Sequence, residues 1–116
     1  MSNFTTIPFS QINIRYTADL VCLIPTAGYS TCTVQLDDLG ATTWGTAVVT
    51  IKRSNRPTGP WYALETTGAG INTIGPGGGM SGTINVSGCQ YLGLFVTTAE
   101  GGGADKFILP TVCLKG

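Results

Sequence analysis

The sequence predicts an all-β domain, an antiparallel β-sandwich of the immunoglobulin-like or jelly-roll-like kind with eight or nine strands. Apolar residues recur at every second position, and clusters of Gly, Pro, Asn and Ser interrupt them about every eight to twelve residues. No window of eleven or more residues has the i, i+3, i+4, i+7 spacing of an amphipathic helix. We therefore expect little or no helix.

The predicted strands follow one another along most of the chain. Alternation is clearest between residues 31 and 36, where Cys32, Val34 and Leu36 share one face and polar residues share the other. Thr and Val, which are β-branched and fit a pleated strand, dominate these segments. In order, the predicted strands are Gln11–Tyr16, Ala18–Ile24, Thr31–Leu36, Thr46–Arg53, Trp61–Glu65, Ile71–Ile74, Thr83–Val86, Tyr91–Thr98 and Phe107–Leu114.

The domain organisation predicted from the length is simple, because 116 residues suit one domain. Residues 11–116 are expected to form a single sandwich. Residues 1–10 contain Phe4, Ile7 and Phe9 ahead of the first clear strand. This segment is either an arm that docks on a neighbouring subunit or an edge strand of its own sandwich, and the pattern leaves both alternatives open.

Two glycine-rich loops have few side chains that could anchor them. One contains Gly77, Gly78 and Gly79, and the other contains Gly101, Gly102 and Gly103. Because glycine loses the most backbone entropy on ordering, both loops should be mobile unless a partner holds them. They are therefore candidate subunit contacts.

Composition excludes several classes of function. Charged residues make up 10% of the chain, against about 25% in an average soluble domain, the net charge is zero and histidine is absent. Only Lys52, Arg53 and Arg56 lie close together, beside a turn, which is too few basic residues for a nucleic-acid track. The first residues lack a signal peptide, and no apolar run is long enough to span a bilayer, so we expect a soluble protein that is not secreted.

The four cysteines do not have the spacing of a metal site, since C-x-x-C pairs and histidine are both missing. If neighbouring strands form hairpins, Cys22 lies opposite Cys32 and Cys89 lies opposite Cys113, which would permit two disulfides. A chain kept in a reducing compartment favours free thiols instead. We therefore predict four free, mostly buried cysteines and no metal.

Catalytic groups are also missing from the sequence. Without histidine, a serine or cysteine nucleophile lacks its usual base. Asp37 and Asp38 are adjacent, so in an extended chain they point to opposite faces and cannot flank one bond. We expect these two residues to form a solvated turn. The alternative is that they form a weak cation site. We predict that the protein is not an enzyme and has no cofactor.

Part of the chain resembles small β-sandwich virion proteins of tailed bacteriophages. The similar segments are residues 44–54 (WGTAVVTIKRS), 61–64 (WYAL), 84–88 (INVSG) and 91–98 (YLGLFVTT). The resemblance implies a capsid decoration, cement, head-fibre or tail accessory protein. Its partners would be copies of itself and other virion proteins, the major capsid protein above all. It would be made in the host cytoplasm and located in the virion.

The sequence therefore predicts a non-enzymatic structural protein that acts through subunit contacts. The alternative is a lectin-like module that binds a glycan through exposed rings, for which Trp44, Trp61 and Tyr62 are the candidates. The candidate subunit contacts are Phe4, Ile7, Phe9, Trp44, Trp61, Gly77, Gly78, Gly79, Gly101, Gly102 and Gly103.

Overall fold

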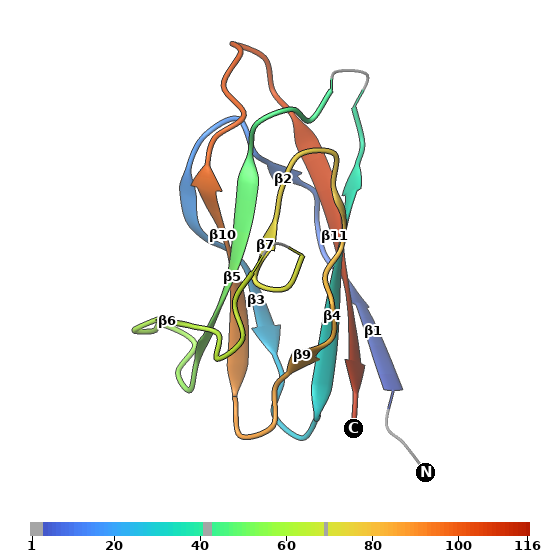
Figure 1. Ribbon diagram of the computed structural model, residues 1–116, viewed down its shortest axis with the longest axis vertical. Coiled ribbons are helices and arrows are strands. Elements are labelled where there is room, and N and C mark those ends of the chain that lie inside the picture. The colour runs from blue at the N-terminus through green and yellow to red at the C-terminus, as the bar shows by residue number, and fades with distance from the viewer. Residues whose placement is uncertain (1–3, 41–42, 69) are drawn as a thin grey trace.

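The computed structural model describes residues 4–40, 43–68 and 70–116, and these residues form two antiparallel sheets packed face to face (Figure 1). The predicted all-β sandwich is confirmed, with eleven strands among the described residues and no helix. Within the same ranges, no helix is long and apolar enough to cross a membrane.

Each sheet mixes long strands with strands of two residues. The first sheet contains β1 (Phe4–Pro8), β2 (Ile12–Asn13), β4 (Thr31–Asp38), β8 (Gly79–Met80), β9 (Ile84–Asn85) and β11 (Phe107–Lys115). The second sheet contains β3 (Ala18–Pro25), β5 (Val48–Ser54), β6 (Tyr62–Ala63), β7 (Thr73–Ile74) and β10 (Tyr91–Thr98).

The order of the strands is that of a jelly roll. Both β1 and β2 pair with β11, both β6 and β7 pair with β5, and both β8 and β9 pair with β4, so each couple counts as one interrupted strand. In the resulting series of eight, the first strand pairs with the last and the second, β3, pairs with the seventh, β10. This nested pairing distinguishes a jelly roll from an immunoglobulin-like sandwich.

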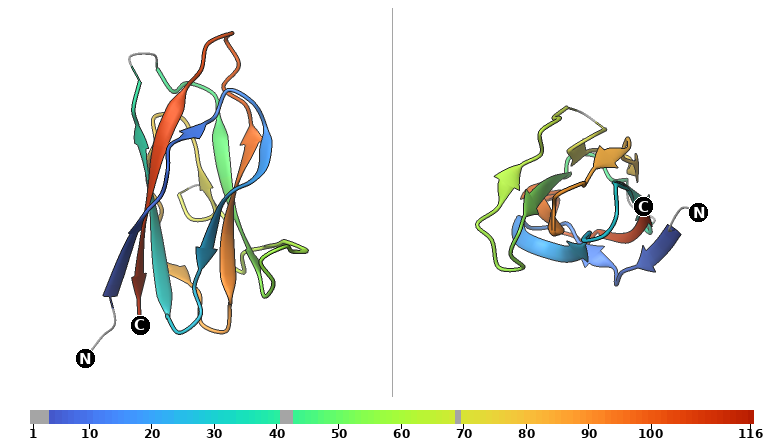
Figure 2. Two further views of the ribbon diagram at one scale, coloured as in Figure 1. Left: turned by 180° about the vertical axis from the view of Figure 1, so that it is seen from behind. Right: turned by 90° about the horizontal axis from the view of Figure 1, so that it is seen from below.

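The jelly-roll order overturns both hairpins expected from the sequence. Strands β3 and β4 lie in different sheets, as do β10 and β11 (Figure 2). Cys22 is therefore opposite Leu94, and Cys32 is opposite Leu114. All four cysteines are free, as predicted, and burial raises the pKa of the Cys22 and Cys32 thiols to about 12.

The core lies between the sheets and follows the predicted alternation on the long strands. Along β4 the buried residues are Cys32, Val34 and Leu36, and β11 alternates in the same way. Strand β10 differs because it is buried on both faces.

A second apolar cluster covers the outer face of β10. A methyl group on Gly93 would lie within about 3 Å of Leu20, Phe95 and Trp61, so glycine is what allows these side chains to close over the strand. Leu20 has a φ of 45°, a left-handed conformation rare for leucine, beside a register shift between β3 and β10.

The N-terminal segment is an edge strand of its own sandwich, while residues 1–3 of the predicted arm lie outside the described residues. Strand β1 pairs with β11, and Ile7 and Phe9 pack against the core. The Phe9 N–H donates to the carbonyl of Pro110 at 3.1 Å, so alternation directs the Thr6 N–H toward the free edge. Pro8 has no N–H to offer there, which limits pairing with another strand.

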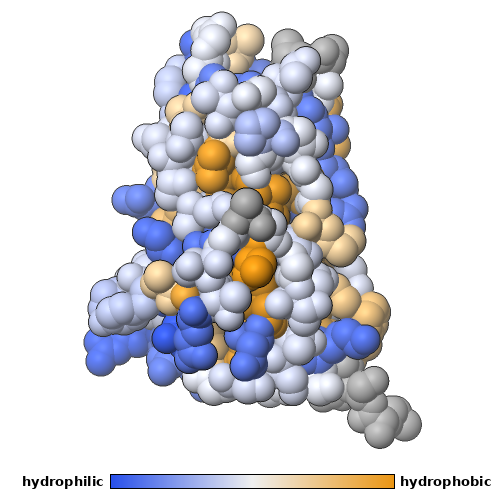
Figure 3. Space-filling model, in the orientation of Figure 1, coloured by the Kyte–Doolittle hydropathy of each residue, from blue (hydrophilic) through white to orange (hydrophobic). Residues whose placement is uncertain are grey.

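The short strands β6, β7, β8 and β9 lie on one side of the sandwich, where apolar side chains reach the surface between the sheets (Figure 3). Leu64, Ile71 and Ile84 line a small pocket of about 140 Å³ on this side. The first glycine-rich loop also lies here and contains β8, a strand that glycines without side chains could not reveal in the sequence.

Gly78 is a position where only glycine fits. Its φ is +76°, and a Cβ atom there would stand 2.7 Å from the carbonyl oxygen of Leu36 and 3.1 Å from the ring of Trp44. Gly77 has a φ of +90° but nothing within 4 Å of a built Cβ. The loop is therefore packed onto the domain at Gly78, contrary to the expectation of a loop without internal anchors.

We expect Gly78→Ala to destabilise the fold more than Gly77→Ala. Both variants incur the cost of a left-handed alanine, about 1 kcal/mol, but only Gly78→Ala adds overpacking, at about 1–3 kcal/mol. Urea unfolding monitored by Trp fluorescence measures the difference. Equal losses in the two variants would contradict the close packing of Gly78 on Trp44.

Candidate functional site

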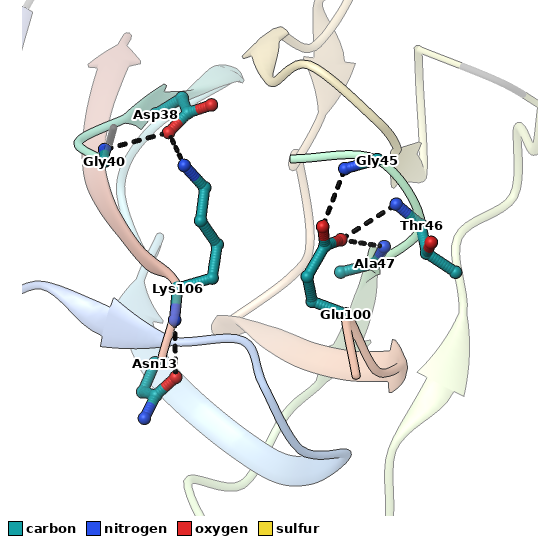
Figure 4. A network of polar contacts seen from close by, with 8 residues as sticks. All are labelled: Asn13, Asp38, Gly40, Gly45, Thr46, Ala47, Glu100 and Lys106. Carbon is teal, nitrogen blue, oxygen red and sulfur yellow. Dashed lines mark hydrogen bonds and ion pairs between the residues drawn. The ribbon is translucent and has the colours of Figure 1, made fainter. Parts of the chain in front are cut away.

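Three connections between the sheets meet at one end of the sandwich, the upper end in Figure 1. They are residues 14–17, which lead from β2 to β3, residues 39–47, which lead from β4 to β5, and residues 99–106, which lead from β10 to β11. We call this the crossover end; residues 41 and 42 of it lie outside the described residues. A network of polar contacts holds the three connections together (Figure 4).

The carboxylate of Glu100 accepts three backbone hydrogen bonds from the neighbouring connection. Its Oε2 accepts from the N–H of Gly45 at 2.8 Å, and its Oε1 accepts from Thr46 and Ala47 at 2.8 and 2.9 Å. These hydrogen bonds, those of Gly45 and Ala47 foremost, hold the pKa of Glu100 below its usual value. The side chain therefore links residues 99–106 to residues 39–47.

Lys106 forms a second link, which joins residues 99–106 to the end of β4. Its side chain is 2% exposed, and its ammonium contacts the carboxylate of Asp38 at the end of β4. That contact, followed by the N–H of Gly40, lowers the pKa of Asp38. Asp38 is therefore a partner of a buried cation, which corrects the prediction that Asp37 and Asp38 form a solvated turn.

The remaining connection, residues 14–17, is held by backbone hydrogen bonds and by the carboxylate of Asp105. The N–H of Ile14 donates to the carbonyl of Lys106 at 2.8 Å, and the N–H of Glu100 donates to the carbonyl of Ile14 at 2.9 Å. Asp105 accepts from the amide of Asn13 at 3.0 Å and from Arg15 at 3.4 Å, contacts that lower its pKa. Each connection is thus fixed to at least one of the other two.

This network supports an exposed surface that is partly apolar. Tyr16 is 61% exposed and Leu39 is 48% exposed. The guanidinium of Arg15 lies 5.0 Å from the centre of the Tyr16 ring, which orients the ring through a cation–π contact. Between Glu100 and Asp105 the loop turns through three exposed glycines, Gly101–Gly103, each with φ above +70°. The exposed side chains at the crossover end can contact a partner. The carboxylates of Asp38, Glu100 and Asp105 are already hydrogen-bonded within the domain.

The structure removes Trp44 from the candidate contacts. Its side chain is 1% exposed, and its indole N–H donates to the carbonyl of Ala47 at 2.8 Å. It is a core residue, so the prediction that it contacts a partner or a glycan is wrong. Trp61 is half-buried and meets Phe95 edge-on, with ring centroids 5.5 Å apart. Its ring packs on its own domain, whereas Tyr62 is exposed.

The other predicted contacts do not form one surface. Phe4 is exposed, at 64%, on β1, whose first residue lies at the end of the molecule opposite the Gly101–Gly103 loop (Figure 1). Ile7 and Phe9 are half-buried against the core. Gly77 lies beside Trp44, whose carbonyl accepts its N–H at 2.9 Å, and Gly79 begins β8. Of the predicted set, Gly101, Gly102 and Gly103 are exposed at the crossover end, where Trp44 also lies but is buried.

Sequence reasoning missed the residues that organise this end. Glu100 and its three donors are more than fifty positions apart, and Lys106 is 68 positions from Asp38, so no local spacing connects them. Tyr16 and Leu39 could have been noticed as apolar residues beside turns. Within the described ranges, no three acids or cysteines gather as a metal site would require.

No protein-family model matches the chain, and no curated protein matches it. Among solved structures, the chain is similar to the crystal structure of the SPBc2 prophage-derived protein YomS. The TM-score is 0.70 with 8% sequence identity, and the match covers 100% of this chain and 96% of that one. At this identity the likeness shows a shared fold.

We expect Glu100→Gln to destabilise the domain by about 1–2 kcal/mol near neutral pH, because both carboxylate oxygens accept from backbone N–H groups and the NH₂ of glutamine cannot replace one of them. Since folding lowers the pKa of Glu100, its contribution is present above the pKa of the unfolded chain and is lost as pH falls through the lower folded value. The difference in unfolding free energy between wild type and Glu100→Gln should therefore shrink in acid.

The matched control is Glu65→Gln, because Glu65 forms an exposed ion pair with Arg53 and its side chain is 75% exposed. This variant should change stability by less than about 0.5 kcal/mol. Urea unfolding at several pH values measures both variants. A Glu100→Gln variant as stable as Glu65→Gln at neutral pH would contradict the anchoring role of Glu100.

Proposed function

We propose that this protein is a non-enzymatic structural component of a tailed-phage virion, a capsid decoration, cement or other accessory protein. It acts through subunit contacts made by the crossover end. The observation that carries the proposal is that two large apolar side chains, Tyr16 and Leu39, are exposed on connections that Glu100 and Lys106 fix to one another.

Rigidity favours a role in binding because a preorganised surface loses less conformational entropy when it meets its partner. Standard protein interfaces bury about 800 Å² on each partner, roughly an eighth of the 6024 Å² that this chain exposes. One end of a sandwich can supply that area. Exposed glycines at the tip, Gly101–Gly103, let a partner's backbone approach closely.

The engagement of the ionisable groups supports contact over catalysis. The carboxylates of Asp38, Glu100 and Asp105 all accept hydrogen bonds from groups at or next to the crossover end, and all have lowered pKa values. A general base must instead be positioned toward a substrate with a pKa near the working pH. These carboxylates are better suited to holding loops than to moving protons.

The phage setting is supported by two likenesses, one in sequence segments and one in fold. The fold-level neighbour is described as prophage-derived, and jelly rolls recur in viral shells. The partners we propose are copies of this chain and other virion proteins, the major capsid protein first. The corresponding location is the virion, after synthesis in the host cytoplasm.

A sedimentation assay tests the proposal with particles of the encoding phage that lack this protein. Wild-type protein mixed with such particles should pellet with them. The double variant Tyr16→Ser/Leu39→Ser should remain mostly in the supernatant, with binding weakened at least about tenfold, because removing central apolar contacts typically costs more than 1 kcal/mol each.

Tyr62→Ser is the matched control, because Tyr62 is as exposed as Tyr16, at 61%, and lies outside the crossover end. It should pellet like wild type. Equal pelleting of all three proteins would reject the crossover end as the contact surface. Wild-type protein that stays in the supernatant at saturating concentration would reject the decoration role itself.

A further inference from the structure

A pocket of about 400 Å³ opens between the β5–β6 hairpin and the β9–β10 turn, away from the crossover end. Its lining includes Arg53, Asn55, Arg56, Pro60, Tyr62 and Cys89. The hairpin projects from the sandwich at the lower left of Figure 1, and strongly hydrophilic side chains gather there in Figure 3. The volume lies within the range of small-ligand pockets in proteins, about 300–1,000 Å³.

Hydrogen bonds fix the two sides of this pocket relative to each other. The side chain of Asn55 accepts the N–H of Gln90 at 3.3 Å, which joins the hairpin to the turn. The hydroxyl of Thr26, a fully buried side chain, donates to the carbonyl of Cys89 at 3.0 Å, and the N–H of Thr26 donates to Gln90 at 2.8 Å. These hydrogen bonds therefore hold the walls of the pocket in place in the folded domain.

The charge of the pocket is positive. Two arginines line it, and no acidic residue does so among the described residues. Arg53 uses one terminal nitrogen to contact Glu65 at 3.1 Å and its Nε to donate to the carbonyl of Ala63. Because Glu65 is 75% exposed, this ion pair screens the guanidinium charge only in part. Guanidinium groups bind carboxylate and phosphate through paired N–H donors, so the pocket suits an oxyanion.

The remaining lining adds a ring face and further donors. Tyr62 is 61% exposed and Pro60 is exposed, so both present flat apolar surfaces beside the arginines. The carbonyl oxygen of Asn55 is used by Gln90, which leaves its NH₂ group as a donor, and the Ser54 hydroxyl, which accepts from Arg56, still carries a proton to donate. Ring faces and amide donors are what sugar rings and their hydroxyls contact.

We propose that this pocket binds an anionic sugar, a hexose ring that carries a phosphate or carboxylate group. The acid group contacts Arg56 and Arg53, and the ring lies against Tyr62. The site is independent of the contacts proposed at the crossover end. Of the three rings expected to bind a glycan, Trp44 is buried and Trp61 packs on Phe95, and only Tyr62 lines this pocket.

The test is a titration of ¹⁵N-labelled full chain followed by amide chemical shifts, with glucose 6-phosphate and glucuronic acid as probes. Both should shift amides of residues 53–62 and 88–90 saturably. Glucose should bind at least about tenfold more weakly, because the charge-assisted hydrogen bonds to arginine are lost. If an oligosaccharide of glucuronic acid binds more tightly than the single sugar, the anionic sugar that the pocket recognises is part of a polysaccharide.

Two variants separate the charge from the ring. Arg56→Gln should weaken both anionic sugars at least about tenfold, whereas Lys52→Gln should change binding less than twofold. Lys52 is a matched control because its ammonium lies 4.9 Å from the Phe95 ring centre and does not line the pocket. Tyr62→Ala should weaken glucose 6-phosphate at least about fivefold and leave inorganic phosphate unchanged.

Three results would overturn the proposal. One is the lack of saturable shifts at millimolar probe, and another is inorganic phosphate binding as tightly as glucose 6-phosphate. The third is a glutamate-rich peptide that binds more tightly than either sugar and is indifferent to Tyr62→Ala, since the pocket would then be a protein contact.

Discussion

The carboxylate of Glu100 is the contact on which the crossover end depends. In this jelly roll, β4 and β5 lie in opposite sheets, as do β10 and β11, so each pair is joined by a connection that leaves one sheet and enters the other. Backbone N–H groups in such connections have no strand partner, and Glu100 satisfies three of them at once. One side chain thereby holds two inter-sheet connections together.

Lys106 extends this constraint across the first sheet. A buried ammonium requires a compensating charge, because leaving it unpaired would carry a large desolvation penalty. Asp38 supplies that charge from the end of β4. Since Lys106 directly precedes β11, the contact also fixes where β11 begins beside β4. Five of the twelve charged residues, Arg15, Asp38, Glu100, Asp105 and Lys106, thus lie where strands change sheets, and the exposed Tyr16 and Leu39 stand on the same connections.

The sequence predicted the elements of the fold better than their arrangement. Period-two alternation located long strands that bury one face, as Cys32, Val34 and Leu36 do on β4. The same alternation cannot tell which sheet a strand joins, and so the two hairpins were wrong. Strand β8 was missed because glycines have no side chains to alternate.

The candidate site was predicted less well than the fold, for a physical reason. A tryptophan in a connection can point inward or outward, and the burial of Trp44 depends on the close approach of Gly78, which is far away in the sequence. Glu100 stands beside three glycines, yet its partners, residues 45–47, are found only in three dimensions. Basic residues near the β5–β6 turn could be read as solvated charges until Arg53 and Arg56 were seen to share a pocket.

Amide hydrogen exchange at Gly45, Thr46 and Ala47 measures whether Glu100 holds the crossover end together. These amides belong to a connection, and Gly45 and Thr46 are exposed, so their protection depends on the carboxylate. Exchange at these amides should be at least about a hundredfold slower than in an unstructured chain, while Gly102 and Gly103 exchange rapidly. Exchange of Gly45 and Thr46 as fast as that of Gly102 and Gly103 would contradict this role of Glu100.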